Sequence, residues 1–302
     1  MAQRPQIVRT IPQLRKAVRS WRRRGKTIAL VPTMGALHAG HMSLVETAKK
    51  NANRTVVSIF VNPTQFGPNE DFSTYPRHEQ QDWEMLAKAK ADLLYVPSVP
   101  VMYSEDFSTN VEVLGHLTSR MEGSTRPHHF AGVMTVVAKL LLQCLPDMAV
   151  FGEKDYQQLL AVQRMVLDLD MPVEILAAPI VREADGLAMS SRNAYLSPTE
   201  RTLAPRLYQV MQNVAKELSG GRPVNEALYL GRDWLEGAGL RVDYLEVRDA
   251  NAYIIMHVSN TNASRYTRLK TCNLHRCHAH QFNSGDHAGS EAKDGVGTRR
   301  SL

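Results

Sequence analysis

The chain has 302 residues, of which 43% are hydrophobic, which is enough to bury the core of one large α/β domain and a smaller second domain. Its formal net charge of +6 is concentrated near the C-terminus, because residues 251–302 carry seven Lys or Arg and three Asp or Glu. The first 250 residues are therefore close to neutral. Without a basic stripe interleaved with aromatic residues, the composition argues against a nucleic-acid-binding protein.

Cysteine use and hydropathy exclude two further classes of protein. Three cysteines are too few for a disulfide framework, and Cys144 lies in an apolar segment, where a free thiol behaves as a small hydrophobic side chain. The N-terminal region lacks the apolar run of a signal peptide. The longest apolar segment, residues 133–145, is interrupted by Lys139 and is too short to span a membrane. We therefore predict a cytoplasmic protein without a membrane segment.

In chain order, apolar runs alternate with segments that carry apolar residues at helical spacing. Helices are predicted at 11–21, 42–50, 82–90, 132–145 and 156–168, and strands at 28–31, 55–61, 92–96, 148–151 and 173–181. Strands that are continuous apolar runs separated by helices indicate a parallel sheet covered on both faces. The predicted fold is α/β, with a Rossmann-like parallel-sheet domain at 1–186 and a smaller C-terminal α+β domain at 187–283.

The predicted C-terminal domain begins with a change of pattern after Met189. A helix start at Ser197 leads into helical patterns that reach about Leu218, a second helix is predicted at 224–235, and a strand at 241–247. From about residue 251 the apolar periodicity is lost, and this abrupt change motivates the hypothesis of a shifted reading frame. Residues 284–302 are predicted to be disordered, because so few apolar residues cannot offset the entropy of ordering them.

The segment 32–41, PTMGALHAGH, lies between the predicted strand at 28–31 and the predicted helix at 42–50. A strand, a glycine-bearing turn and a helix start together form an anion site, because unpaired main-chain N–H groups point outward there. His38 and His41 are three residues apart, so both rings lie on one helix face and can approach the same phosphate. Taken alone, such a pair more often belongs to an ordinary helix start.

Other polar segments follow three of the four remaining predicted strands, those at 55–61, 148–151 and 173–181: residues 62–66, 152–155 and 181–183. In a parallel sheet, ligands bind at the carboxyl ends of the strands, so these segments should converge with the histidine pair. The segment 189–193, MSSRN, offers two hydroxyls and a guanidinium suited to a polyphosphate, although serine runs also favour helix caps. Together the motifs predict an enzyme that splits a nucleotide at its α-phosphate.

Seven segments, in this order and spacing, resemble the pantoate–β-alanine ligase family of the His-x-Gly-His nucleotidyltransferase superfamily. They are residues 32–41, 62–66, 75–77, 126–133, 151–158, 181–186 and 189–193. The resemblance implies an AMP-forming ligase that uses ATP and Mg²⁺. In that family the carboxylate of pantoate attacks the α-phosphate, magnesium pyrophosphate leaves, and the amine of β-alanine displaces AMP from the pantoyl adenylate. The resemblance also implies a homodimer.

The resemblance assigns roles to individual residues. It implies that His41 is the general acid, with His38 and Lys154 as further catalytic groups at the α-phosphate. Gln65 and Gln158 match the pantoate-binding glutamines, and Gln65 also lies near the β-alanine site. ATP contacts are implied for Met34, Gly35, Ala36, Leu37, His38, Ala39, Gly40, His41, Gly152, Glu153, Lys154, Asp155, Val181, Met189, Ser190, Ser191 and Arg192. The ligands of Mg²⁺ stay open.

Several alternatives remain at this stage. Arg126 is a substrate-binding candidate that could instead be a solvated loop charge, and Gln65 could cap a loop. His128 and His129 are interpreted as loop residues rather than ligands. Cys272 and the residues near it could bind zinc, but their spacing lacks a Cys-x-x-Cys arm.

The C-terminal region departs from the family pattern, and this departure leaves a second function open. Only Thr267–Leu269 matches the Thr-Arg-Leu-Ile-Asp-like segment in which the family continues. The alternative to an active ligase is therefore a catalytically impaired nucleotide-binding homologue with a defective C-terminal domain.

Overall fold

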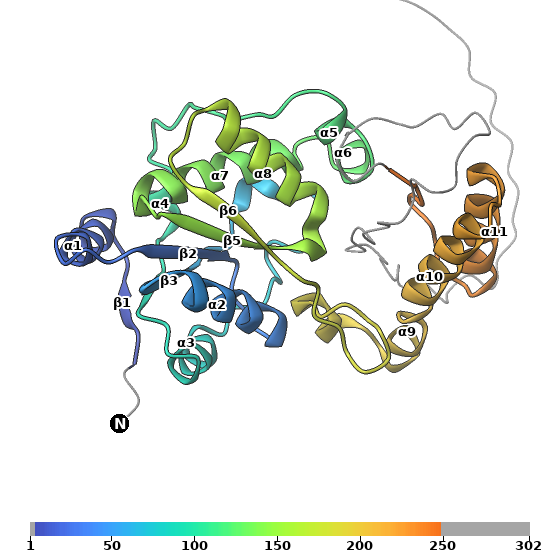
Figure 1. Ribbon diagram of the computed structural model, residues 1–302, viewed down its shortest axis with the longest axis horizontal. Coiled ribbons are helices and arrows are strands. Elements are labelled where there is room, and N and C mark those ends of the chain that lie inside the picture. Colours follow the sequence, from blue (N-terminus) through green and yellow to red (C-terminus); the bar gives the residue numbers. More distant parts are fainter. Residues whose placement is uncertain (1–3, 249–302) are drawn as a thin grey trace, which may run out of the picture.

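The computed structural model describes residues 4–248, and its centre is a six-stranded parallel sheet (Figure 1). The strand order is β1-β4-β3-β2-β5-β6, which confirms the predicted α/β fold with a parallel sheet. The strands are β1 (Gln6–Val8), β2 (Ile28–Thr33), β3 (Arg54–Ile59), β4 (Leu93–Tyr95), β5 (Met148–Gly152) and β6 (Glu174–Ala178). Five of them were predicted, whereas β1, only three residues long, was missed.

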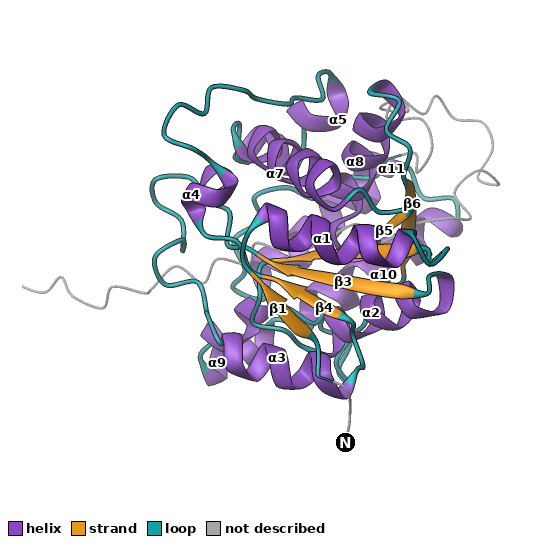
Figure 2. Cartoon of the chain, turned by 90° about the vertical axis from the view of Figure 1, so that its left-hand side faces the viewer, coloured by secondary structure: helices purple, strands orange, loops and turns teal. Residues whose placement is uncertain are grey.

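Helices cover both faces of this sheet (Figures 1 and 2). One face packs against α1 (Ile11–Arg22), α7 (His129–Cys144) and α8 (Tyr156–Asp168). The other packs against α2 (Ala39–Asn51) and α3 (Glu79–Lys88). Successive residues of β2 point to opposite faces, so Leu30 joins the first core and Val31 the second. Each fully buried side chain of this kind contributes roughly 1.5–3 kcal/mol.

Short helical segments line the connections near the carboxyl edge of the sheet. They are the 3₁₀ turns η1 (Pro63–Gln65), η2 (Glu153–Asp155) and η3 (Ser191–Tyr195), and the short helices α4 (Val99–Met102), α5 (His116–Ser119) and α6 (Glu122–Thr125). Sequence periodicity did not reveal any of the three short helices, because a single turn shows no repeat.

Beyond the sheet lie three further helices, and the last two of them carry a separate hydrophobic cluster. They are α9 (Pro198–Leu203), α10 (Arg206–Ser219) and α11 (Val224–Gly237). Leu207, Val210 and Leu218 of α10 bury their side chains against α11, whose Gly231 leaves no room for a side chain next to Val214. The helical pattern predicted from Ser197 is divided at Pro205, since a proline inside a helix removes a hydrogen bond and clashes with the preceding turn.

The strand predicted at 241–247 was wrong. These residues form an irregular segment whose apolar members Val242, Leu245 and Val247 pack on the α10–α11 cluster. A strand requires a hydrogen-bonded neighbour, and none of the described residues pairs with this segment. The predictions for the tail, namely disorder at 284–302, the reading-frame hypothesis and the zinc alternative, fall outside the described residues.

Two predictions from composition can be compared with the fold. Cys144 is buried at the end of α7, and burial raises the pKa of its thiol to about 12. Within residues 4–248, none of the helices is both long and apolar enough to cross a membrane.

Candidate active site

The histidine motif lies between the carboxyl end of β2 and the start of α2, as predicted. Gly35 has φ +84°, and a Cβ there would approach Ile59 to 3.0 Å, so the tight turn needs a glycine. Gly40 is required for a different reason: its Cβ would lie 2.9 Å from the His38 ring. The two glycines therefore let the chain turn sharply and let the first histidine lie against the helix start.

Both histidines hold the main chain at the start of α2. His38 is the N-cap residue, and its Nδ1 accepts the Gly40 N–H at 3.2 Å, while the Nδ1 of His41 accepts the His38 N–H at 3.3 Å. The ring centroids are 4.1 Å apart. Because a neutral imidazole that accepts through Nδ1 carries its proton on Nε2, both rings present an Nε2–H donor. The pair thus combines a helix N-terminus with two adjacent N–H donors, an arrangement suited to phosphate.

Lys154 follows β5, the strand that pairs with β2 on the side opposite β3. Its side chain is half-buried, and burial lowers the pKa of its ammonium group, an effect that Asp155 opposes and Arg192 reinforces. A bound anion would favour the charged form of this lysine, because nearby opposite charge raises the pKa of an ammonium group. Because it follows the carboxyl end of β5, Lys154 lies at the same edge of the sheet as the histidines, as predicted.

The Ser190–Arg192 segment contacts the histidine turn. Ser190 caps the 3₁₀ turn η3 by accepting the Arg192 N–H at 3.2 Å, and the Ser191 hydroxyl donates to the Ala36 carbonyl at 3.0 Å. Met189 is held by its own N–H, which donates to the carbonyl of Val181 at 3.0 Å. The cap alternative is thus correct for Ser190, while Ser191 connects this segment to the histidine turn 155 residues earlier.

Arg192 is paired within the protein. Its guanidinium makes a two-bond contact with Asp71, with Nε and one terminal nitrogen each 2.9 Å from a carboxylate oxygen. The guanidinium carbon also lies 5.3 Å from the centre of the Tyr75 ring. The predicted polyphosphate contact of Arg192 would therefore compete with the carboxylate of Asp71.

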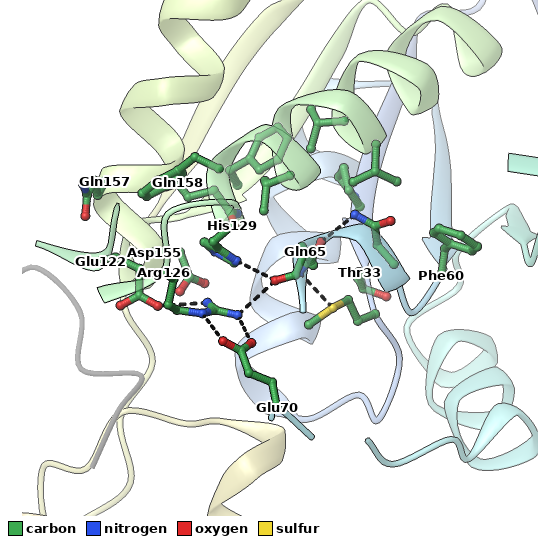
Figure 3. Close-up of a pocket in the computed structure, with 18 of the residues that line it drawn as sticks. Thr33, Phe60, Gln65, Glu70, Glu122, Arg126, His129, Asp155, Gln157 and Gln158 are labelled. Atoms are coloured by element: carbon green, nitrogen blue, oxygen red, sulfur yellow. Dashed lines mark hydrogen bonds and ion pairs between the residues drawn. The ribbon is translucent and has the colours of Figure 1, made fainter. Parts of the chain in front are cut away.

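A cavity of about 200 Å³ has His41 in its lining, and Figure 3 shows Gln65, Arg126 and Gln158 around it. It brings together all three predicted substrate-binding residues, Gln65, Gln158 and Arg126. Of the predicted ATP contacts, it includes Met34, His41, Asp155 and Arg192, while the others lie outside its lining. One wall is apolar and is formed by Phe60, Phe130, Val133, Val136, Val137, Leu140 and Phe151.

Gln65 is held in the cavity by its neighbours (Figure 3). Its Oε1 accepts from the Asn62 amide at 3.1 Å, and its Nε2 lies 3.2 Å from the Met34 sulfur. The loop-capping alternative for Gln65 was wrong, since the cap of η1 is Asn62, which accepts the Thr64 N–H. Sequence reasoning missed Asn62 as a cavity residue, although it is a polar side chain placed directly after a buried strand.

Arg126 is a buried member of an ion-pair cluster, so the alternative of a solvated loop charge was wrong. Its side chain is 11% exposed and forms ion pairs with Glu70 and Glu122. A third contact runs to the Gln65 carbonyl at 3.1 Å. The Tyr244 hydroxyl, from the segment after α11, donates to Glu122 at 3.2 Å. Through this cluster, residues from three parts of the chain, at 65–70, 122–126 and 244, meet at one end of the cavity.

His129 is a further cavity residue that sequence reasoning interpreted as a loop residue. It is the first residue of α7, and its Nδ1 lies 3.0 Å from the Gln65 carbonyl, so Nδ1 carries a proton. Burial, together with the positive charge of Arg126, lowers the pKa of His129 to about 4. The imidazole is therefore neutral at pH 7. Its place at the start of the apolar helix predicted from residue 132, close to Arg126, was the sequence signal that could have indicated it.

The acidic and histidine side chains of the described region do not form a metal centre. Within 4–248, no group of three or more His, Cys, Asp and Glu side chains is arranged to hold a metal ion. The cavity beside the histidine helix start instead has a lining that is part apolar and part polar, with amide, carboxylate, guanidinium and imidazole groups.

The chain as a whole is similar to proteins of one family. A family model described as pantoate-beta-alanine ligase matches residues 6–274. The pantothenate synthetase of Nitrobacter winogradskyi is 53% identical over 246 residues, which cover 82% of this chain and 87% of that protein. The pantothenate synthetase of Rhodospirillum rubrum is 54% identical over 244 residues, covering 80% and 86% respectively.

Solved structures agree with the sequence comparisons. The crystal structure of pantothenate synthetase from Thermus thermophilus superposes with a TM-score of 0.75 at 49% identity, covering 79% of this chain and 85% of that chain. A pantoate-beta-alanine ligase from Francisella tularensis, complexed with beta-gamma ATP and beta-alanine, superposes with a TM-score of 0.72 at 34% identity, covering 81% and 90%.

The fold and the site therefore define an α/β ligase of the nucleotide-binding type. Within that class, the chain belongs to the pantoate-beta-alanine ligase family.

Proposed function

We propose that this chain joins pantoate to β-alanine, with cleavage of ATP to AMP and pyrophosphate. The observation that carries the proposal is the cavity that places Gln65 and Gln158 next to His41, at the start of a helix suited to binding phosphate. Family membership and the Francisella relative, complexed with an ATP species and β-alanine, support ATP and β-alanine as substrates.

The reaction proceeds in two steps. An oxygen of the pantoate carboxylate attacks the α-phosphorus of ATP, and the bond between that phosphorus and the bridging oxygen of pyrophosphate breaks. The product is a mixed anhydride, pantoyl adenylate. The amine of β-alanine then attacks the acyl carbon, AMP leaves with the bridging oxygen, and the nitrogen loses a proton to give the amide.

The histidine pair serves the first step in this proposal. Negative charge increases on the non-bridging α-phosphate oxygens as the carboxylate attacks, and preorganised donors stabilise that charge most effectively. The Nε2–H groups of His38 and His41 are such donors, because the main chain fixes both rings through Nδ1. The family resemblance assigns His41 the further role of general acid, and Lys154 adds a positive charge.

The acid end of the site fits pantoate by its chemistry. Pantoate has two hydroxyls, a carboxylate and two methyl groups on one carbon. Gln65 and Gln158 supply amides that both donate and accept, as hydroxyls require. The apolar wall, which includes Val133, Val136 and Phe151, suits the two methyl groups. In this proposal Arg126 contributes through the cluster with Glu70 and Glu122 that shapes the cavity.

Three further predictions accompany this function. Mg²⁺ enters with ATP and is held mainly by phosphate oxygens, the ligands that this cation prefers. The homodimer and the cytoplasmic location follow from the family resemblance and the composition.

The alternative of an impaired nucleotide-binding homologue is not favoured, because identity of about 50% extends over most of the chain.

Product analysis with each substrate omitted in turn tests the function. We expect AMP and pyrophosphate, with pyrophosphate released when ATP and pantoate are present and β-alanine is absent. AMP should accompany stoichiometric pantothenate only in the complete mixture. Formation of ADP and inorganic phosphate would contradict the adenylate mechanism, and a lack of pantoate dependence would contradict the acid substrate.

A further inference from the structure

Asp82 is a buried carboxylate on α3, a helix in which the sequence indicated no site residue. Its side chain is 2% exposed, and its two oxygens accept the main-chain N–H groups of Ala36 at 2.9 Å and Leu37 at 2.7 Å. These are the residues that lead from the carboxyl end of β2 into the histidine pair. One side chain from a different element thus holds two consecutive peptide groups of the nucleotide turn.

The turn held by Asp82 has an unfavourable backbone conformation. Gly35 has φ +84° and Ala36 has φ +48°, so two consecutive residues lie in the left-handed region, which alanine adopts rarely. Such a conformation persists only where the surrounding structure imposes it. The Ser191 hydroxyl contacts the carbonyl of Ala36 at 3.0 Å, so the two polar main-chain groups of this residue are held from opposite directions.

Burial of a carboxylate is costly unless hydrogen bonds compensate it. Burial raises the pKa of Asp82, and the hydrogen bonds from Leu37 and Ala36 act in the opposite direction. An apolar residue at this position of α3 would avoid the desolvation cost but would leave both N–H groups without their acceptor. The arrangement therefore fixes the course of the turn, rather than only filling space between α3 and β3.

We propose that Asp82 is a positioning residue for the nucleotide site, which sets the place of the His38 ring by fixing the main chain at Ala36 and Leu37. His38 directly follows Leu37, and its ring must meet the Gly40 N–H to cap α2. A shift of the turn would move this ring relative to the α-phosphate, and displacements of about 1 Å can cost roughly 10²-fold in rate. The inference rests on the proposed function, because it requires ATP to bind at this turn.

The replacement Asp82→Asn tests the inference. Asparagine has the same shape but only one oxygen, so its NH₂ group would face one of the two N–H donors. Asp147→Asn is a matched control, since Asp147 accepts the Ile28 N–H at 2.7 Å and pairs with Arg22 at the opposite edge of the sheet. For each protein we would measure ATP affinity by calorimetry, kcat, both substrate KM values and Tm.

We expect Asp82→Asn to weaken ATP affinity at least tenfold and to lower kcat, with the pantoate KM changed less than about threefold. Asp147→Asn should lower Tm without changing ATP affinity. Unchanged ATP affinity in Asp82→Asn, or an equal loss in Asp147→Asn, would overturn the inference. If the unmodified protein binds no ATP, the proposed function fails instead.

A measurement on the unmodified protein keeps the inference testable if Asp82→Asn does not fold. In the absence of ATP, the amides of Ala36 and Leu37 should exchange with solvent at least roughly 100-fold more slowly than those of an exposed turn, because Asp82 already holds them. Exchange at the rate of an exposed turn would overturn the inference. Asp82→Glu, which keeps both oxygens on a longer side chain, should fold and show intermediate ATP affinity.

Discussion

At the proposed nucleotide end of the site, the histidine pair is held by short-range contacts to the main chain, whereas at the proposed acid end side chains from several elements meet. The turn after β2 and the start of α2 lie within ten residues of sequence, and the histidines cap that helix through contacts three residues apart or fewer. The acid end instead depends on contacts such as that between Arg126 and Glu70, which are 56 residues apart. The helix start and its histidine caps are locally encoded, but the turn before them depends on Asp82 of α3. The acid end forms only when the whole domain has folded.

This difference predicts how each end fails when it is altered. A change at the proposed nucleotide end should chiefly lower turnover, because the fold depends on the histidines only through their cap contacts at α2. A change at the acid end should affect both substrate use and stability, because the same side chains join distant elements. The following predictions test this contrast, beginning with the largest effect.

His38→Ala, His41→Ala and Lys154→Ala should each lower kcat by roughly 10²-fold or more, as removal of a donor to the transition state usually does. Steady-state kinetics with all three substrates would measure this, with His116→Ala, an exposed histidine on α5, as the matched control. Near-normal turnover in the His41 and Lys154 variants would mean that the α-phosphate binds elsewhere.

Gln65→Ala and Gln158→Ala should raise the pantoate KM roughly 10- to 100-fold with little change in ATP affinity. The reason is that buried polar partners left unpaired cost about 1–3 kcal/mol. Calorimetry with ATP and kinetics with pantoate separate the two effects, and Gln209→Ala on the exposed side of α10 is the control. An equal loss of ATP affinity would contradict the division between the two ends.

The neutral state of His129 predicts a pH dependence of stability. Its folded-state pKa of about 4 lies below the unfolded value of about 6.5, so the unfolded chain binds more protons between these values. The contribution of His129 to the free energy of unfolding is therefore fully present above about pH 6.5 and is lost as the pH falls toward 4. His129→Gln should flatten the change of unfolding free energy over this interval, measured by urea titration.

The exposed neighbour His128 provides the comparison for this pH effect. His128→Gln removes an exposed imidazole from the same turn and controls for the loss of a histidine there. If both replacements change the slope equally, burial of His129 is not its cause.

Tyr244→Phe should have the smallest effect. It removes one hydrogen bond to Glu122, worth about 0.5–1.5 kcal/mol, and keeps the ring. We expect Tm to fall by about 1–4 °C and the pantoate KM to rise less than about threefold. An effect on pantoate use as large as that of Gln65→Ala would show that the segment after α11 closes over the acid rather than only bracing Glu122.

Sequence reasoning succeeded where the determinants are local. The strand, glycine turn and helix start around His38 follow from residues next to one another, and the alternation of apolar runs predicts the parallel sheet. It failed where a partner lies far along the chain. Nothing near Asp82 indicates that its carboxylate meets Ala36, and Arg126 alone does not reveal its pairing with Glu70. The strand at 241–247 was wrong for a related reason, because strand formation depends on a distant neighbour.

The capping role of His38 has a practical consequence for trapping complexes. His38 is the N-cap of α2 and, in the proposed function, also a donor to the α-phosphate, so its loss would remove both together. Asparagine is among the best N-cap residues and can accept the Gly40 N–H without an imidazole. His38→Asn should therefore give a folded protein with slow turnover, in which ATP and pantoate could remain together long enough for crystallography. His38→Ala, by contrast, would loosen the helix start proposed to bind them.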